Sequence, residues 1–183
     1  PATAPTSVSG TTTICLGQST TLTAQGGSDG SGALFQWYLG SCGAGFLSNA
    51  NQITVSPTTT TTYYVRRVGT SSCTQTTSCF AVTVVVQPIP TIYTVTGTAS
   101  ICDGQATSIS LSGSQVGLNY ELFLNGSSTG ISIAGTGSSL VFPNISTQGT
   151  YTVEADVSSN YCPGSYSMTG SATITVNPVP TVT

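Results

Sequence analysis

The sequence predicts an all-β fold, with two Greek-key β-sandwiches in tandem. Three observations predict it: a composition rich in threonine and valine, short segments in which apolar and polar residues alternate, and a sequence pattern that occurs twice. A chain of 183 residues exceeds the usual size of one small sandwich and suits two domains of about 90 residues, each with a modest core.

The composition favours strands over helices. The chain has 2 residues that are Lys or Arg and 5 that are Asp or Glu, so the residues on which most long helices depend are scarce. Threonine and valine are β-branched, and such side chains fit a pleated, half-buried surface better than a helix. The chain should therefore be nearly all strand, with a neutral surface rich in hydroxyl groups.

One pattern occurs twice along the chain. The segment Thr13–Ser19 (TICLGQS) matches Ser100–Ala106 (SICDGQA), so Cys15 corresponds to Cys102 at an offset of 87 residues. Two later pairs of segments match at offsets of 88 and 90 residues: Thr62–Val65 with Thr150–Val153, and Gln87–Thr91 with Asn177–Thr181. A period of this length is that of one small sandwich.

A Pro-x-Pro-Thr signature falls between the two copies and again at the end of the chain. Proline fixes φ and lacks a backbone donor, so each joint should be short, extended and fairly stiff. We therefore expect one domain over residues 1–88, a second over residues 89–178, and the start of a following repeat or a linker over residues 179–183.

Alternation and turn signals predict six strands in each copy. In the first copy they lie near Thr6–Ile14, Ser19–Ala24, Leu34–Leu39, Gln52–Val55, Thr62–Val68 and Phe80–Val86. In the second copy they lie near Tyr93–Ser100, Thr107–Ser112, Tyr120–Leu124, Ser139–Phe142, Thr150–Val157 and Ala172–Val176. Asn125-Gly126 is the strongest signal for a tight hairpin, and the spacing of the strands is typical of a Greek-key sandwich.

The same alternation predicts the core. We expect Trp37 to be the central packing residue of the first copy and Leu122 its counterpart in the second. Tyr63 and Tyr151 each begin a late strand, where sandwich domains often place a tyrosine whose hydroxyl binds a nearby loop.

Along the strand near Thr62–Val68, alternate residues should face opposite sides of the sheet. This places Tyr63, Val65 and Arg67 on one face and Tyr64 and Arg66 on the other. Core packing is the plain interpretation of these aromatic residues, ahead of ligand contact.

The charges exclude two classes of partner. A net charge of −3 with two arginines and no lysine cannot neutralise a run of phosphates, which drives most nucleic-acid affinity. The same shortage removes polybasic attraction to anionic lipid, and no apolar run approaches the roughly 20 residues that a spanning helix needs. We expect neither nucleic-acid binding nor membrane insertion.

The sequence offers little for catalysis or for metal binding. It has no histidine, so Ser-His-Asp and Cys-His arrangements cannot form. Glu154 and Asp156 are the one close acidic pair, and a solvated strand explains them better than glycoside hydrolysis does. Asp29 and Asp103 are too isolated for a calcium loop. We expect a protein that is not an enzyme and holds no cofactor or metal.

The 6 cysteines indicate disulfides in an oxidising compartment, and hence export. Zinc sites usually show pairs of cysteines two to four residues apart, and the nearest spacing is wider, from Cys73 to Cys79. The second copy has two cysteines, and the repeat alignment carries their pairing to the first copy. This alignment gives three bonds: Cys102 to Cys162, Cys15 to Cys73, and Cys42 to Cys79.

Two other arrangements of the cysteines stay open. In strict Greek-key topology the aligned pairs lie at opposite ends of a sandwich, which argues against that pairing. A local bond from Cys73 to Cys79, with Cys15 bonded to Cys42, is the main competitor. Bonds between neighbouring domains are the third arrangement.

Segments of both copies resemble a known family. In the first copy, Ile14–Ala24, Phe35–Tyr38 and Val55–Val65 closely resemble immunoglobulin-like repeats of giant surface proteins in Bacteroidota. The second copy, through Gly117–Phe123 and Gly149–Ala155, is similar to a sister repeat type. The resemblance implies immunoglobulin-like sandwiches in an adhesin at the bacterial cell surface, exported by the type IX route.

From these features we expect a structural segment of an extracellular adhesin or surface filament, acting as a disulfide-stapled spacer or fibre subunit. Its partners would be neighbouring repeats or copies of the same chain. The alternative is an accessory carbohydrate-binding module of a secreted multidomain enzyme, with Tyr64, Tyr161 and Tyr166 as the platform for a surface glycan. A third hypothesis is self-assembly, in which Pro1–Ile14 completes a neighbouring chain's sandwich.

Overall fold

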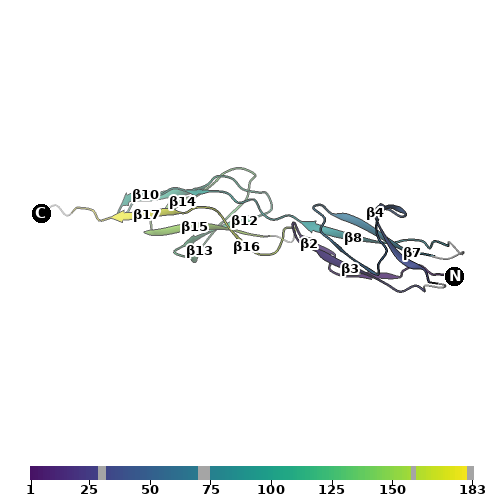
Figure 1. Ribbon diagram of the computed structural model, residues 1–183. Helices are drawn as coiled ribbons and strands as arrows, with labels where there is room; N and C mark the ends of the chain where they lie inside the picture. The colour runs from purple at the N-terminus through teal and green to yellow at the C-terminus, as the bar shows by residue number, and fades with distance from the viewer. Residues whose placement is uncertain (29–31, 70–74, 158–159, 181–183) are drawn as a thin grey trace. The chain divides into compact units, whose positions relative to one another are not determined.

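The chain folds into two β-sandwich units (Figure 1). A computed structural model describes residues 1–28, 32–69, 75–157 and 160–180. Unit 1 comprises Pro1–Pro88 and unit 2 comprises Ile89–Thr183. The described residues contain strands and no helix, so the prediction of an all-β fold with two tandem sandwiches is confirmed.

Unit 1 packs a three-stranded sheet, in the order β1-β3-β6, against a five-stranded sheet, in the order β2-β8-β7-β4-β5. Its strands are β1 (Ser7–Ser9), β2 (Thr13–Cys15), β3 (Thr20–Gln25), β4 (Leu34–Ser41), β5 (Ala44–Ser48), β6 (Gln52–Val55), β7 (Thr61–Val68) and β8 (Phe80–Gln87). The order of these strands, with early and late strands as neighbours, is that of a Greek-key sandwich.

Unit 2 repeats this topology. One sheet has the order β9-β11-β14 and the other the order β10-β17-β15-β12-β13, with β16 added beside β15. Its strands are β9 (Val95–Thr96), β10 (Ala99–Cys102), β11 (Thr107–Leu111), β12 (Asn119–Leu124), β13 (Ser127–Ala134), β14 (Leu140–Ile145), β15 (Gly149–Asp156), β16 (Ser165–Ser167) and β17 (Ala172–Asn177).

The first strand of each unit crosses from one sheet to the other at a glycine. β1 pairs antiparallel with β3, whereas β2 pairs parallel with β8 in the opposite sheet. The crossing points, Gly10 and Gly97, have φ of 133° and 125°, and a Cβ on Gly10 would lie 2.2 Å from the carbonyl oxygen of Thr21. The prediction of one unbroken strand near Thr6–Ile14 was therefore wrong, and both halves pair within their own unit.

Edge strands β5 and β13 were not predicted. Both faces of these strands are largely open to water, and Phe46 and Ile131 are 56% and 41% exposed. A strand that buries neither face shows no apolar alternation, so the usual signal is missing. The hairpin that introduces β13 was predicted from the sequence Asn125-Gly126. In the structure these residues have φ of 51° and 82°, as a tight two-residue turn requires.

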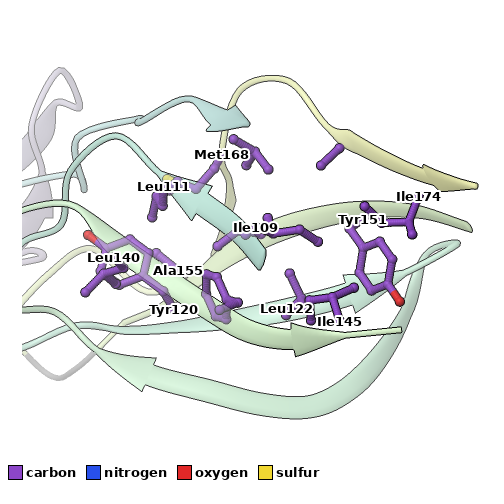
Figure 2. Packing of buried hydrophobic residues seen from close by; sticks show 14 of the residues in the cluster. Ile109, Leu111, Tyr120, Leu122, Leu140, Ile145, Tyr151, Ala155, Met168 and Ile174 are labelled. Carbon is purple, nitrogen blue, oxygen red and sulfur yellow. The ribbon is translucent and has the colours of Figure 1, made fainter. Parts of the chain in front are cut away.

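The two cores are separate clusters, each centred on the predicted residue. Trp37 is fully buried in unit 1 and lies opposite Val65, while its Nε1 donates to the Ala50 carbonyl oxygen at 2.9 Å. Leu122 is fully buried in unit 2 and lies opposite Val153. Figure 2 shows side chains of the unit 2 cluster pointing into one shared interior. Burying each large side chain contributes roughly 1.5–3 kcal/mol.

The predicted tyrosine tie is present in unit 2. The Tyr151 hydroxyl donates to the carbonyl oxygen of Thr147 at 2.8 Å, and burial raises the pKa of this hydroxyl. In unit 1 burial also raises the pKa of Tyr63, but its hydroxyl makes no comparable tie to another residue that the structure describes. The two units therefore share the position of this tyrosine but not its hydrogen bond.

One disulfide is described in unit 1. Cys42, in the turn between β4 and β5, is bonded to Cys79, which directly precedes β8, with a Cα–Cα distance of 5.9 Å. The repeat alignment gives this pair, and the bond rules out the competing link from Cys15 to Cys42. The expected partner of Cys15, Cys73, lies outside the described residues.

The prediction of a bond between Cys102 and Cys162 was wrong. Cys102 is a free, exposed thiol, whereas Cys162 is buried and is not a free thiol. Cys102 ends β10 beside Asn177, the last residue of β17. Cys162 follows β15, which runs antiparallel to β17, so it lies toward the other end of the unit. At about 3.3 Å per strand residue, the gap exceeds the roughly 7 Å that a disulfide can span.

Replacing Tyr151 with phenylalanine should lower the free energy of unfolding of unit 2 by about 1 kcal/mol, because one hydrogen bond is lost at nearly constant volume. Urea unfolding followed by circular dichroism measures this change. Tyr63→Phe is the matched control and should cost less. Equal losses from both substitutions would contradict a role for the Thr147 tie.

Replacing Cys42 with serine should lower the stability of unit 1 by about 2–4 kcal/mol, since the disulfide restricts the unfolded chain. Fluorescence of Trp37, which lies in unit 1, follows this transition during urea unfolding. Cys102→Ser is the control and should leave the transition unchanged, because that thiol is free and exposed. If the Cys42→Ser variant unfolds at the same urea concentration as the parent, the bond does not contribute to the stability of unit 1.

Candidate functional site

The three tyrosines of the predicted glycan platform belong to two different units. Tyr64 lies on β7 of unit 1, whereas Tyr161 and Tyr166 belong to unit 2. The last two are half-buried and pack against the unit 2 core. The Tyr166 hydroxyl donates to the Cys162 carbonyl oxygen at 3.3 Å, which gives this side chain a structural role.

The neighbours of Tyr64 form a different cluster on the outer face of the larger unit 1 sheet. Tyr64 lies directly opposite Tyr38, and Arg66 lies opposite Gln36, across the β4–β7 pair. Phe46 of the edge strand β5 lies beside Tyr38. We call this surface the Arg66 face: Gln36, Tyr38, Phe46, Tyr64 and Arg66.

The Arg66 guanidinium is held firmly by Tyr38. Its Nε and Nη2 donate to the Tyr38 hydroxyl at 3.1 and 2.9 Å, and the guanidinium carbon lies 4.9 Å from the centre of the Tyr38 ring. A Cβ on Gly43 would lie 3.3 Å from the arginine nitrogens, so the glycine next to Cys42 leaves room for the guanidinium. Stacking and donation together fix the orientation of this cation.

Arg67 points the other way, as predicted. Its guanidinium lies 3.9 Å from the centre of the Phe35 ring and donates through Nη1 to the Ala33 carbonyl oxygen at 3.0 Å. Its Nε is buried without a hydrogen-bond partner among the described residues. Arg67 therefore packs at the rim of the core, and Arg66 is the arginine available at the outer face.

The corresponding face of unit 2 carries carboxylates. Glu121 on β12 lies directly opposite Glu154 on β15, and Asp156 follows two residues along β15 on the same face. With Phe123, Gly164 and Ser165 they line a shallow hollow of about 230 Å³. We call this surface the Glu154 face: Glu121, Phe123, Glu154 and Asp156.

Serine hydroxyls hold these carboxylates in place. Ser165 and Ser167 on β16 donate to Glu154, the latter at 3.2 Å, and Ser128 on β13 donates to Glu121. Neither glutamate has a cationic partner in the part of the chain that the structure describes. Like charges directly opposite each other on neighbouring strands destabilise a sheet, so a cation between the two glutamates would stabilise this face.

The two faces occupy equivalent positions. Leu122 opposite Val153 corresponds to Trp37 opposite Val65, so Glu121 and Glu154 take the places of Gln36 and Arg66. The charges of the whole sequence divide in the same sense. Residues 1–88 carry two arginines and one aspartate, a net charge of +1, while residues 89–183 carry four carboxylates and no cation, a net charge of −4.

The sequence indicates the charged residues but not these faces. Alternation places Arg66 and Tyr64 together on one side of their strand, and Glu154 and Asp156 form the one close acidic pair. Glu121 and Gln36 join them only through cross-strand register, which the sequence does not state. Phe46 was missed because β5 was missed. The one signal that could have indicated the faces is the repeat itself, since Arg66 aligns with Glu154 at the offset of the tyrosines.

Each unit also has a groove between the free edges of its two sheets. In unit 2 a hollow of about 330 Å³ lies between β13 and the β14–β15 connection, and in unit 1 one of about 380 Å³ lies between β5 and β6. Both are lined mainly by Ser, Thr, Asn or Gln and by aliphatic side chains, with no charged residue. Nothing in them favours a particular ligand.

Within its described ranges, the structure has no candidate metal-binding cluster and no helix that could span a membrane. No group of three or more Cys, Asp or Glu side chains there is placed to hold a metal ion. Among the same residues, no helix has the length and apolar character needed to cross a membrane.

Comparison with solved structures shows the fold. A marsupial T cell receptor matches 96% of this chain and 73% of its own, with a TM-score of 0.61 at 16% identity. The human OSCAR ligand-binding domain (TM-score 0.37, 12% identity, 93% of this chain and 95% of its own) is a weaker match. So are fibronectin(III)-like modules of Clostridium thermocellum CbhA (TM-score 0.36, 14% identity, 96% and 95%).

No curated protein matches the chain. A family model does, and it matches twice in succession. The model describes an immunoglobulin-like domain that is CHU_C associated, and its two matches cover residues 1–88 and 90–178. These matches span almost the whole sequence and follow the two sandwiches seen in the structure. The chain therefore belongs to the family of CHU_C-associated immunoglobulin-like domains, of which it carries two tandem copies.

Proposed function

We propose that the chain is a structural segment of an extracellular adhesin or surface filament, in which each immunoglobulin-like unit acts as a spacer or fibre subunit under tension. One observation carries this proposal. In both units the strand near the start runs parallel to the last strand and is hydrogen-bonded to it, β2 to β8 and β10 to β17.

Parallel terminal strands determine how a unit responds to pulling. The chain enters a unit at one end and leaves it at the opposite end, because β2 and β8 run in the same direction. The Val85 amide donates to the Thr12 carbonyl oxygen at 2.7 Å, and the Leu16 amide donates to the Gln87 carbonyl oxygen at 2.9 Å. Tension between the ends loads such bonds together in shear, since they lie across the direction of pull.

Unit 2 has the same arrangement. Its Asp103 amide donates to the Asn177 carbonyl oxygen at 2.9 Å, which is the equivalent of the Leu16 bond. In each unit, tension therefore enters at one end and leaves at the opposite end. A pair of strands that had to open one bond at a time would give way more easily.

Other features support an extracellular structural role. A disulfide joins Cys42 to Cys79, and such bonds persist in oxidising compartments. The chain has no histidine, which removes the common hydrolytic triads. The family and the resemblance to repeats of Bacteroidota surface proteins favour the cell surface. Proline-containing joints between units suit an extended array.

Replacing Leu16 with proline removes the amide that bonds to Gln87 and should lower the unfolding force of one unit in single-molecule pulling. In urea, the loss should be about 1 kcal/mol. Leu16→Ala is the matched control, because the side chain is 42% exposed and alanine keeps the amide. Unchanged forces in the proline variant, or a chain that extends without force peaks, would overturn the proposed mechanical role.

A further inference from the structure

The outer faces of the two units are complementary in charge. The Arg66 face presents one fixed cation among aromatic rings, and the Glu154 face presents carboxylates around a hollow. The chain has 7 charged residues in all, and four of them lie on these two faces. In so neutral a protein, these residues dominate the local field.

We propose that the Arg66 face of one copy of the chain docks on the Glu154 face of a second copy, so that copies associate head to tail. The inference rests on the proposed fibre role, since it names the surfaces through which subunits meet. The partner is a second copy of this chain because each copy carries both halves of the contact.

The donor side is ready for binding. Tyr38 already holds the Arg66 guanidinium through its ring and its hydroxyl, so little side-chain freedom remains to be lost on association. Within the described residues no carboxylate pairs with this cation. A planar guanidinium donates two parallel hydrogen bonds to a carboxylate, which gives such a contact its geometry as well as its strength.

The acceptor side gains from a cation. Glu121 and Glu154 lie directly opposite each other, so an arginine placed between them relieves their repulsion. Phe123 lines the same hollow of about 230 Å³ and offers an apolar wall. Asp156, at the rim, is exposed and adds to the attraction at a distance.

Apolar contact supplements the charges on the donor side. Phe46 is 56% exposed and packs edge-on against Tyr38, with 6.2 Å between ring centres. Tyr64 lies beside Tyr38 on the same face and is half-buried. Aromatic and arginine side chains of this kind are enriched in protein interfaces.

Symmetry decides the form of the assembly. Two Arg66 faces repel each other, as do two Glu154 faces, so the contact must join unlike surfaces. A contact between unlike surfaces leaves one free face on each partner, so further copies can add until a ring closes, whereas contact between like surfaces would stop at a dimer.

The test is a charge-swap experiment in a Cys102→Ser background, which removes the free thiol as a cause of dimers. Sedimentation velocity over a range of concentrations at low salt measures association of the full chain. The parent should associate, and Arg66→Glu and Glu154→Arg should each weaken association by roughly tenfold or more. An equimolar mixture of the two variants should restore it, because the Arg66→Glu copy keeps an intact Glu154 face that can bind the intact Arg66 face of the Glu154→Arg copy.

Asp103→Arg is the matched control. It changes the net charge by the same amount as Glu154→Arg, but Asp103 lies beyond the end of β10 and away from the face, so association should persist. Salt at about 1 M, where the screening length is roughly 3 Å, should weaken the association of the parent chain. Circular dichroism of each variant checks that both units are folded.

Three results would overturn the proposal. The parent could be monomeric at every concentration, the mixture could fail to restore association, or Arg66→Glu could change the scattering profile of a monomer, which would place the contact within one chain. Each result is separate from the proposed function, because the unfolding force of single monomers does not depend on this contact. If single monomers unfold at the expected force but the chain does not associate, the docking proposal is wrong and the proposed spacer role still stands.

Discussion

The crossing of the first strand from one sheet to the other is the constraint on which the rest of the fold depends. It occurs at Gly10 and Gly97, where the backbone passes so close to the neighbouring strand that no side chain fits. After the crossing, β2 and β10 reach the edge of the larger sheet and pair with the last strand. Without this crossing, the larger sheet would end at β8 or β17, and no strand near the start of a unit would be hydrogen-bonded to its last strand.

Much of this fold can be predicted from the sequence, because burial leaves a periodic trace. Trp37 and Leu122 are at the centres of their cores, and Tyr151 makes the expected tie. Edge strands such as β5 and β13 leave no such trace, since water meets both of their faces. The break at Gly10 also leaves no trace, because a change of sheet preserves the alternation on either side.

The candidate site was only partly predictable, for a related reason. Which residues share a strand face follows from sequence, so Arg66 and Tyr64 could be placed together and Arg67 apart. Which residues meet across strands depends on register, and this pairs Glu121 with Glu154. The cysteines show the same limit. Repeat alignment correctly paired Cys42 with Cys79. It also paired Cys102 with Cys162, although these residues lie toward opposite ends of the second sandwich.

The exposed thiol of Cys102 gives the molecule a natural position for chemical labelling. It lies beside Asn177, where the chain leaves the second unit, and belongs to neither charged face. Among the described cysteines it is free, so a maleimide dye attached there would sit at the exit of the sandwich without disturbing its core. Energy transfer from such a dye to a second label near Pro1 would report the end-to-end extension of the chain directly in solution.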